Sequence, residues 1–257
     1  MVERPGRLEG KRAVITGGGR GIGRAIALGY AAEGARCVIT SRKVEDLEAT
    51  AAEAPAGALT PVACDVGDDA SVADMAEAAT AALGAVDIVV NNAGIHAAGR
   101  FLDIGPETFA DLYNVNVVGI VRVSQAFLPA MIESGRGSVV NIASTAGLFE
   151  SPGQSPYNAS KHGAVGLTRC MALELAPTGV NCNAICPGFV DTPMIDGFAA
   201  ITGAEREQLR ATLAARTPMG RMLEPQEIAH LAVYLGSDES SGMTGQTMAI
   251  SNGMRMA

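Results

Sequence analysis

Short runs of β-branched and apolar residues alternate along the chain with longer alanine-rich segments that have the 3.6-residue period of helices. Such alternation is typical of βαβ units, which place their strands in a parallel sheet between layers of helices. Strands covered on both faces are nearly all apolar, and residues 86–90, Val-Asp-Ile-Val-Val, come close to that composition. The pattern therefore predicts a doubly wound α/β fold with helices on both faces of the sheet.

The limits of the expected elements follow from this pattern and from the turn residues between them. Seven strands are predicted, at residues 12–16, 35–40, 59–64, 86–90, 137–142, 180–185 and 246–250. Helices are predicted at residues 21–33, 44–54, 69–83, 106–133, 156–176 and 225–235. Left-handed residues are expected at helix ends at Gly34, Gly84, Gly135 and Gly179. Pro156 and Pro225 fit the first turns of their helices.

The chain reads as a single domain. Its 257 residues are within the range that one α/β domain fills, and no linker, low-complexity tract or internal repeat divides them. The one irregular stretch, residues 187–219, is long enough to be a mobile lid over a site. Its apolar residues indicate a hydrophobic substrate, unless they pack on the sheet or on a neighbouring subunit; they are Met194, Ile195, Phe198, Ile201 and Met219.

Charge and composition exclude several classes of partner. A net charge of −8 repels a phosphate backbone, and a chain without Trp and with 4% aromatic residues is poorly suited to stacking bases, so we expect no nucleic-acid binding. No apolar run approaches the roughly 20 residues that span a bilayer. The first 11 residues carry charges and no apolar stretch, so we expect no secretory signal and a cytoplasmic protein.

The cysteines and histidines do not suggest a metal site. The five cysteines form no C-x-x-C pair and no cluster with histidine, so they read as small buried hydrophobic residues. The histidines lie far apart in sequence. His162 is expected to be structural, whereas His96 is close enough to the segment Asn91 to Gly94 to reach a pocket rim.

A glycine-rich turn follows the first predicted strand and leads into a helix. Its sequence, Thr-Gly-Gly-Gly-Arg-Gly-Ile-Gly at residues 16–23, has the spacing T-G-x-x-x-G-x-G. The spacing G-x-G-x-x-G does not fit, because Ile22 stands where the third glycine falls for Gly17 and Gly19. Backbone N–H groups and the helix dipole would face a bound phosphate. A tight turn without a ligand is the alternative interpretation.

The end of the second predicted strand indicates which dinucleotide such a turn would hold. A carboxylate there binds the ribose 2′-hydroxyl of NAD(H), whereas an arginine accommodates the 2′-phosphate of NADP(H). Ser41, Arg42 and Lys43 stand there, and no carboxylate precedes Glu45. With Arg20 in the turn, two guanidinium groups could clamp the phosphate. We therefore predict NADP(H), with NAD(H) as the alternative and solvated charges as the alternative role of Arg42 and Lys43.

Tyr157 and Lys161 lie one helical turn apart and on the same helix face. An ammonium group about 4 Å from a phenol interacts with it by about 4 kcal/mol at an effective dielectric of about 20. This interaction could lower the pKa of the tyrosine from about 10 by up to about three units, into the range of general acid–base catalysis. In isolation, Y-x-x-x-K is also a common surface pattern.

These motifs do not occur in isolation here. The glycine-rich turn, Asn-Asn-Ala-Gly at residues 91–94, Asn116, Ser144, and Tyr157 with Lys161 together resemble the classical branch of the short-chain dehydrogenase/reductase family. The resemblance covers about residues 8–253. It implies a Rossmann-like doubly wound seven-stranded parallel sheet and an oxidoreductase that interconverts a ketone and a secondary alcohol without a metal.

The resemblance also implies a role for each matching residue. Tyr157 protonates the carbonyl oxygen, Lys161 lowers the tyrosine pKa and binds the nicotinamide ribose, Ser144 holds the substrate oxygen, and Asn116 positions a relay water. Asp65 and Val66 contact the adenine, Asn91 to Gly94 line the cofactor, and residues 187–192 hold the carboxamide. The implied cofactor-binding set is Gly17, Gly19, Arg20, Gly21, Ile22, Gly23, Ser41, Arg42, Asp65, Val66, Asn91, Ala93, Gly94, Tyr157, Lys161, Pro187, Gly188, Val190 and Thr192.

The substrate and the assembly are less constrained. Residues 141–147, 156–163 and 186–194 resemble ketoreductases of acyl-carrier and polyketide pathways, although steroid, sugar and cyclic-alcohol dehydrogenases share similar segments. The substrate is therefore expected to be a small ketone or alcohol, free or bound to an acyl carrier that docks on Arg122, Arg136 and Arg169. The family resemblance implies a homo-oligomer, a tetramer or dimer, although Ser251-Asn252-Gly253-Met254 replaces the usual Val-Asp-Gly-Gly ending.

Two readings of a different kind stay open. One is a cofactor-sensing protein that has kept the fold and lost the chemistry, and the complete set of Asn116, Ser144, Tyr157 and Lys161 argues against it. The other is an epimerase or dehydratase on an extended version of the fold. That version usually requires a larger C-terminal substrate domain than the residues after Thr192 supply.

Overall fold

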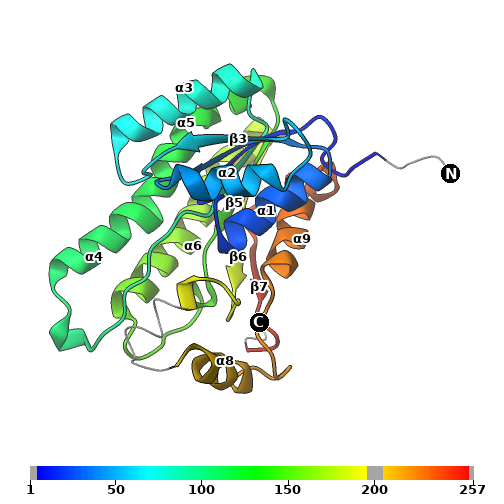
Figure 1. Ribbon diagram of the computed structural model, residues 1–257. Coiled ribbons are helices and arrows are strands. Elements are labelled where there is room, and N and C mark those ends of the chain that lie inside the picture. Colours follow the sequence, from blue (N-terminus) through cyan, green and yellow to red (C-terminus); the bar gives the residue numbers. More distant parts are fainter. Residues whose placement is uncertain (1–4, 196–204, 255–257) are drawn as a thin grey trace.

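Figure 1 shows the computed structural model, which describes residues 5–195 and 205–254. Within these residues, seven parallel strands form one sheet in the order β3-β2-β1-β4-β5-β6-β7. They are β1 (Arg12–Thr16), β2 (Arg36–Ser41), β3 (Leu59–Ala63), β4 (Ile88–Asn91), β5 (Gly137–Ile142), β6 (Val180–Pro187) and β7 (Thr247–Ile250). The predicted Rossmann-like doubly wound sheet is confirmed. Its order reverses between β1 and β4, and ligands of such sheets bind at this switch point.

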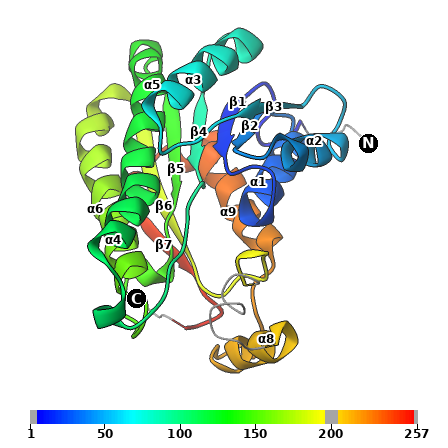
Figure 2. The same ribbon diagram turned by 60° about the vertical axis from the view of Figure 1, so that its left-hand side comes forward.

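Helices cover both faces of the sheet (Figure 2). One layer holds α1 (Gly21–Ala32), α2 (Val44–Ala52) and α9 (Pro225–Gly236), and the other holds α3 (Asp69–Leu83), α5 (Gly119–Ser134) and α6 (Ser155–Leu175). Successive strand residues face opposite layers. In β1, Ala13 and Ile15 pack in the first layer and Val14 packs in the second, all fully buried. Burial on both faces explains why apolar residues predominate in the central strands.

The predicted helix ends agree with the structure. Gly34, Gly84, Gly135 and Gly179 have φ values of 88°, 78°, 68° and 78°, as left-handed residues after helices do. Pro156 and Pro225 stand in the first turns of α6 and α9. The strand limits differ from the predicted ones by up to two residues, as in β4, which begins at Ile88 instead of residue 86.

The helix predicted at residues 106–133 is not a regular α-helix. It consists of α4 (Pro106–Tyr113), one π-helical turn (Asn114–Val118) and α5. Side-chain hydrogen bonds accompany the wider turn: Asn114 Nδ2 donates to Gly67 O at 3.1 Å, and Asn116 bonds to the backbone of Ile95. Such π turns occur mostly at functional sites, and hydrophobic periodicity alone does not reveal them.

Taken together, α4, the π turn and α5 form one helical segment, Pro106–Ser134, that is long and apolar enough to cross a membrane. Its most apolar 18 residues have a mean hydropathy of 1.5. The criterion is also met by core helices of proteins that do not span membranes. Here Val123, Phe127 and Met131 of α5 are buried against the sheet. Packing inside the fold thus accounts for part of the apolar character of this segment, of whose most apolar 18 residues 44% are buried.

The stretch predicted to be an irregular lid is partly regular. Its first residue, Pro187, belongs to β6, and residues Arg206–Ala215 form α8. Leu209 and Leu213 of α8 are buried with Ile195 and Met222 in a small separate cluster. The prediction of an irregular lid is therefore wrong for Arg206–Ala215, because Leu209 and Leu213 form the buried face of a helix. Phe198 and Ile201 lie outside the described residues.

The cysteine prediction needs one correction. Cys37, Cys64, Cys182 and Cys186 are buried free thiols, as expected, but Cys170 is exposed. It lies on an exposed face of α6. Among the described residues, no three His, Cys, Asp or Glu side chains are grouped as a metal site requires.

Candidate active site

The glycine-rich turn connects β1 to α1 at the switch point of the sheet. Gly17 and Gly21 have positive φ values of 68° and 55°. A Cβ atom on Gly23 would lie 2.1 Å from Gly17 O and 2.4 Å from Asn92 Nδ2, so no larger residue fits without moving the turn. The Arg20 side chain does not cap α1. The first N–H groups of the helix are therefore placed to bind an anion.

The loop after β4 is tied directly to this turn. Thr16 Oγ1 accepts hydrogen bonds from the backbone N–H groups of Asn92 and Ala93, each at 3.0 Å. Asn92 Nδ2 donates to Thr16 O at 2.9 Å and to Gly17 O at 3.2 Å. The carboxyl ends of β1 and β4 are thereby held together, and sequence reasoning gave Thr16 and Asn92 no individual role.

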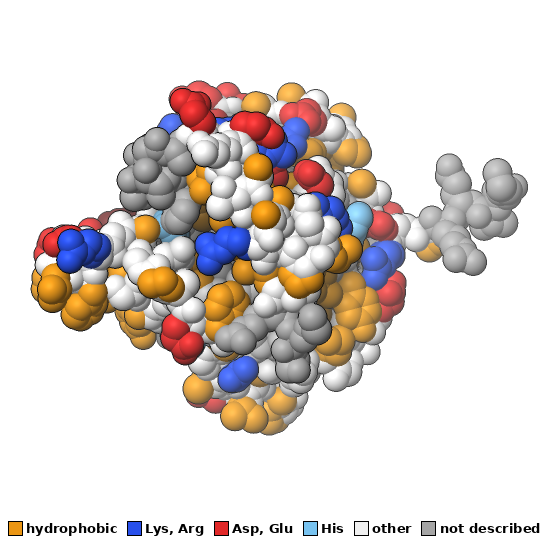
Figure 3. All heavy atoms as spheres, turned by 90° about the horizontal axis from the view of Figure 1, so that it is seen from below, with side chains coloured by type: hydrophobic (Ala, Val, Ile, Leu, Met, Phe, Trp, Pro, Cys, Tyr) orange, Lys and Arg blue, Asp and Glu red, His pale blue; other side chains and the backbone are white. Residues whose placement is uncertain are grey.

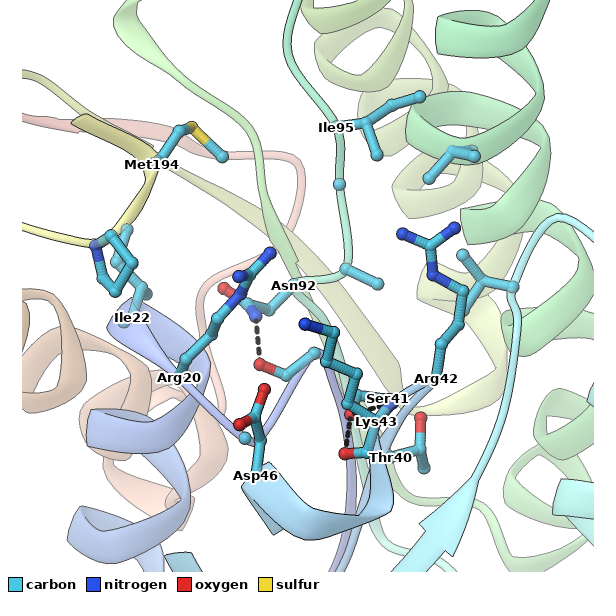
Figure 4. Close-up of a pocket in the computed structure, with 18 of the residues that line it drawn as sticks. Arg20, Ile22, Thr40, Ser41, Arg42, Lys43, Asp46, Asn92, Ile95 and Met194 are labelled. Atoms are coloured by element: carbon cyan, nitrogen blue, oxygen red, sulfur yellow. Dashed lines mark hydrogen bonds between the residues drawn. The ribbon is translucent and has the colours of Figure 1, made fainter. Parts of the chain in front are cut away.

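A cavity of about 640 Å³ opens over the turn (Figure 4). It lies at the carboxyl ends of β1 to β4, as expected for a dinucleotide in a doubly wound fold. Most of the residues predicted to bind the cofactor line it: Gly17, Gly19, Arg20, Gly21, Ile22, Ser41, Arg42, Asp65, Val66, Ala93, Gly94 and Thr192. Pro187, Gly188, Val190, Tyr157 and Lys161 line the adjoining cavity instead.

Asn91 and Gly23 line neither cavity. The Asn91 side chain is buried, and its Nδ2 donates to Asn141 Oδ1 at 2.9 Å and to Ser124 Oγ at 3.1 Å. These bonds link β4 to β5 and α5 beneath the site. The side chain of Asn91 is thus placed to support the site from below and does not face a ligand in the cavity.

Positive side chains converge on the cofactor cavity. Figure 4 shows Arg20 on one side and Arg42 on the other, with Lys43 between them in this view. Among the described residues, none of these three forms an ion pair within 4.0 Å. Asp46 at the start of α2 also lines the cavity. Asp65 lines it as well, so three cations face two carboxylates, and this excess of positive charge favours an anionic ligand.

A second cavity of about 260 Å³ adjoins the first and contains the predicted catalytic side chains. Ser144 follows β5, and Tyr157 and Lys161 come from the first turns of α6. The Ser144 hydroxyl hydrogen-bonds to the Tyr157 side chain. Lys161 Nζ donates to Ile142 O at 3.0 Å and lies 5.8 Å from the centre of the Tyr157 ring. The structure therefore brings all three side chains to one wall.

The pKa of Tyr157 differs from the expectation. Burial raises it above its ordinary value, and the hydrogen bond with Ser144 opposes this rise. The net lowering of this pKa that was expected from Lys161 is therefore not seen here, where burial has the largest effect. Burial also lowers the pKa of Lys161 to about 8. A neutral phenol next to a serine hydroxyl can donate a proton to an oxygen in the cavity.

Asn116 lies in the π turn and reaches the same wall. Its Oδ1 accepts from Ile95 N at 2.9 Å, and its Nδ2 donates to Ile95 O at 2.9 Å and to Ser160 Oγ at 3.0 Å. A Cβ on Gly94 would lie 3.1 Å from Asn116 Oδ1 and 3.6 Å from Lys161 Nζ. Asn116 and Lys161 thus converge at Gly94, while the Asn116 amide itself is engaged in fixing the loop.

His96 lies deeper than the expected pocket rim. It lines both cavities, and its ring packs edge-on against Tyr157 with the ring centres 4.6 Å apart and an interplanar angle of 63°. Burial lowers its pKa. The sequence signal for His96 was its position two residues after Gly94; no pattern indicated contact with Tyr157.

The remaining walls of the second cavity are mostly apolar. Of the expected lid residues, Met194 and Ile195 line it, whereas Met219 is exposed and lines neither cavity. Phe189, from the segment expected to hold the carboxamide, lines it too. The structure adds residues that the sequence did not indicate, because they come from segments far apart in the chain: Phe149, Ser151, Gln154, Leu213, Arg216, Met222 and Met254.

Comparisons with known proteins agree with this geometry. A family model described as Enoyl-(Acyl carrier protein) reductase matches residues 17–255. The 3-oxoacyl-(acyl-carrier-protein) reductase FabG of Thermotoga maritima is 37% identical over 250 residues, which cover 96% of this chain and 99% of that protein. The 2-keto-3-deoxy-L-fuconate dehydrogenase of Xanthomonas campestris is 39% identical over 248 residues, covering 96% and 81%.

Similarity extends to solved structures. The crystal structure of a short-chain type dehydrogenase/reductase from Mycobacterium marinum matches with a TM-score of 0.90 at 35% identity. The match covers 97% of this chain and 97% of that one. The whole architecture is therefore shared with that chain at the level of the fold.

Proposed function

This chain belongs to the short-chain dehydrogenase/reductase family and is an oxidoreductase of carbonyl and alcohol groups, and we propose that it reduces a ketone with NADPH. The observation that carries the proposal is the meeting of Ser144 and Tyr157 in a cavity that opens onto the glycine-rich turn. The reverse oxidation of the secondary alcohol uses the same groups.

The residues of the first cavity fit a nicotinamide dinucleotide. The glycine-rich turn and the start of α1 would hold the pyrophosphate, and Asp65 and Val66 would contact the adenine. Arg20 and Arg42 lie on two sides of the cavity. They support the choice of NADP(H), because a guanidinium group forms bidentate hydrogen bonds with a phosphate. Asp46 lies near Arg20 in Figure 4, and this carboxylate keeps NAD(H) as the alternative.

The bound nicotinamide would supply the hydride, and the side chains of this chain would manage the charge and the proton. As the carbonyl oxygen becomes negative, the Ser144 hydroxyl stabilises it by a hydrogen bond. Tyr157 donates its proton to the same oxygen. The raised pKa keeps Tyr157 protonated at neutral pH, which is the form that reduction requires.

Lys161 and Asn116 would support Tyr157 from behind. The buried ammonium of Lys161, placed by Ile142 O, would hold the nicotinamide ribose and favour the tyrosinate that forms after proton transfer. Asn116 would place a relay water beside Lys161. Because its amide already bonds to Ile95 and Ser160, the backbone of the π turn is the available acceptor for that water.

The substrate is proposed to be an apolar ketone, free or bound to an acyl carrier. Relatives named for 3-oxoacyl groups and for a deoxy sugar acid indicate two substrate classes to test. If a carrier docks, Arg169 and Arg136 are exposed for it, although Arg136 lies 3.8 Å from Asp87; Arg122 already pairs with Asp69 and bonds to Asn114. We also propose a cytoplasmic homo-oligomer, in keeping with the family resemblance.

A screen of oxo-substrates with both cofactors tests the proposal. Purified protein should consume NADPH with at least one class among 3-oxoacyl thioesters, oxo sugar acids and cyclic ketones. NADH should be used more slowly. Absence of turnover across these classes with both cofactors would contradict a reductase, and faster turnover with NADH would contradict only the cofactor assignment.

A further inference from the structure

His96 and Gln154 come from two segments that are fastened to each other. His96 stands in the loop after β4, and Gln154 immediately precedes α6. Between these segments, Gly99 N donates a backbone hydrogen bond to Gly153 O at 2.9 Å. The two side chains are themselves hydrogen-bonded, and both line the substrate cavity. The pair is therefore part of a fixed wall.

The pair lies beside the proposed proton donor. The ring of His96 packs edge-on against Tyr157 with 4.6 Å between the ring centres. A ketone whose oxygen reaches the Tyr157 hydroxyl would therefore carry its nearest substituents past His96. Any group recognised there lies within a few bonds of the reacting carbon.

The chemistry of the pair suits a small polar group without charge. The Gln154 bond raises the pKa of His96, as expected when the imidazole N–H donates to the amide oxygen, while burial and the nearby Lys161 lower it. With burial as the largest effect, the ring is neutral at neutral pH. A neutral imidazole and a carboxamide together offer donors and acceptors to a hydroxyl or a carbonyl.

We propose that His96 and Gln154 form a second polar subsite, which binds a hydroxyl or carbonyl group one or two carbons from the ketone that reacts. The substrate is then an oxygenated ketone: a hydroxyketone or a dicarbonyl compound. The rest of the cavity, with Phe149, Phe189 and Met194, takes the apolar remainder. The inference rests on the proposed carbonyl reduction and names its substrate class.

Matched pairs of ketones test the subsite. Heptan-2-one is compared with ethyl 3-oxobutanoate, which adds a second carbonyl at similar length, and butan-2-one with 3-hydroxybutan-2-one, which adds a hydroxyl. The quantity measured is the preference, the ratio of kcat/KM for the oxygenated ketone to that for the plain one. Differences in intrinsic reactivity cancel when the preference is compared between protein variants.

Two substitutions remove the polar groups and keep the shape. His96→Phe retains a ring against Tyr157, and Gln154→Met retains the length of the side chain. Each should lower the preference in at least one pair by about tenfold, mainly through KM, because a site built to bond a substrate oxygen discriminates against its absence. The pair of ketones in which the preference falls identifies the second oxygen of the substrate as a carbonyl or a hydroxyl oxygen. His230→Phe, on the exposed side of α9 and outside both cavities, should leave the preference unchanged.

The results separate the subsite from the proposed function. An unchanged preference in both variants, or an equal loss on plain and oxygenated ketones, would overturn the subsite, since His96 would then only pack against Tyr157. Turnover of the ketones by Tyr157→Phe at the wild-type rate would overturn Tyr157 as the proton donor and leave the subsite standing. Absence of turnover of all four ketones, by a wild type that reduces another class of ketone, would overturn the subsite and leave the proposed function standing.

Discussion

The two cavities of this protein are adjacent, but they are built in different ways. The cofactor cavity opens over the glycine-rich turn after β1, and its part at that turn is built from backbone, with glycines where the chain must turn or approach closely. The substrate cavity is walled by side chains from segments as far apart as Ile22 and Met254. A backbone-built site depends on local sequence, whereas a side-chain-built site depends on how the whole chain packs.

This difference implies different responses to substitution. Substitution of a glycine in the backbone-built turn should weaken cofactor binding strongly, because an added Cβ atom displaces the turn. Changes in the side-chain walls of the substrate cavity should be graded. Lys161 lines the substrate cavity next to Gly94, which lines both cavities, and its substitution should affect both chemistry and stability.

The largest effect on turnover among these variants is expected for Lys161→Met. Loss of the ammonium beside Tyr157 should reduce kcat about 10²- to 10⁴-fold. The same change should raise the free energy of unfolding at pH 7 by roughly 1–3 kcal/mol, because it removes a buried charge whose pKa is lowered from 10.5 to about 8. Urea denaturation with activity assays measures both, and a variant that is both inactive and less stable would contradict the stability half of this prediction.

The same lysine predicts a pH dependence of stability. Between about pH 8 and 10.5 the unfolded chain binds a proton that the folded protein has released, so wild-type stability should gain relative to Lys161→Met as pH rises. Denaturation curves of both proteins at pH 7 and pH 10 check the sign. An advantage of the variant that stays constant across this interval would show that Lys161 is not held at a lowered pKa.

Gly23→Ala should weaken NADPH binding about 100-fold, since its Cβ would lie 2.1 Å from Gly17 O and must displace the turn. Gly166→Ala is the matched control: it lies in α6 with nothing within 4 Å of the added Cβ. That control should bind NADPH normally and be stabilised by about 0.5–1 kcal/mol. Calorimetric titration and thermal melts test the pair, and normal NADPH affinity in Gly23→Ala would refute the backbone-built description.

Arg42→Ala should weaken NADPH binding by about 10- to 100-fold and NADH binding by less than about threefold, because a charged hydrogen bond to the 2′-phosphate is lost. Arg100→Ala, a change at an exposed arginine outside both cavities, should alter neither affinity. Equal losses for the two cofactors would count against the phosphate clamp and would favour Asp46 as the determinant of cofactor choice.

The smallest effect is expected in the apolar wall of the substrate cavity. Phe189→Ala should raise KM for an apolar ketone about three- to tenfold while NADPH affinity is kept, since part of one aromatic contact is lost. Phe101→Ala, at a side chain 69% exposed, is its control. A parallel loss of NADPH affinity in Phe189→Ala would show that the two cavities are not separable in this way.

The same contrast explains what could be predicted from sequence. The parallel sheet follows from period and composition, and the cofactor turn follows from glycine spacing, because both are local properties. The π turn, the helix α8 and the contact of His96 with Tyr157 were not predicted. Each depends on partners distant in sequence, such as Gly67 for Asn114 or Met222 for α8.

The pKa of Tyr157 was also beyond local reasoning. The spacing of Tyr157 and Lys161 gives the sign of one interaction, but the extent of burial, which has the larger effect here, is set by the loops that close over the site. The sequence therefore indicated which side chains lie together, but it did not determine whether the pKa of Tyr157 is raised or lowered.

Tyr157 is proposed to donate the proton in the substrate cavity, whereas the dinucleotide is proposed to bind mainly in the adjoining cofactor cavity. The most direct measurement is turnover and NADPH affinity of Tyr157→Phe, with a ketone that the wild type reduces. We expect kcat to fall about 10³-fold, because the proton donor is lost. The dissociation constant of NADPH should stay within about twofold of the wild-type value. Wild-type turnover in this variant would contradict the role of Tyr157 as proton donor.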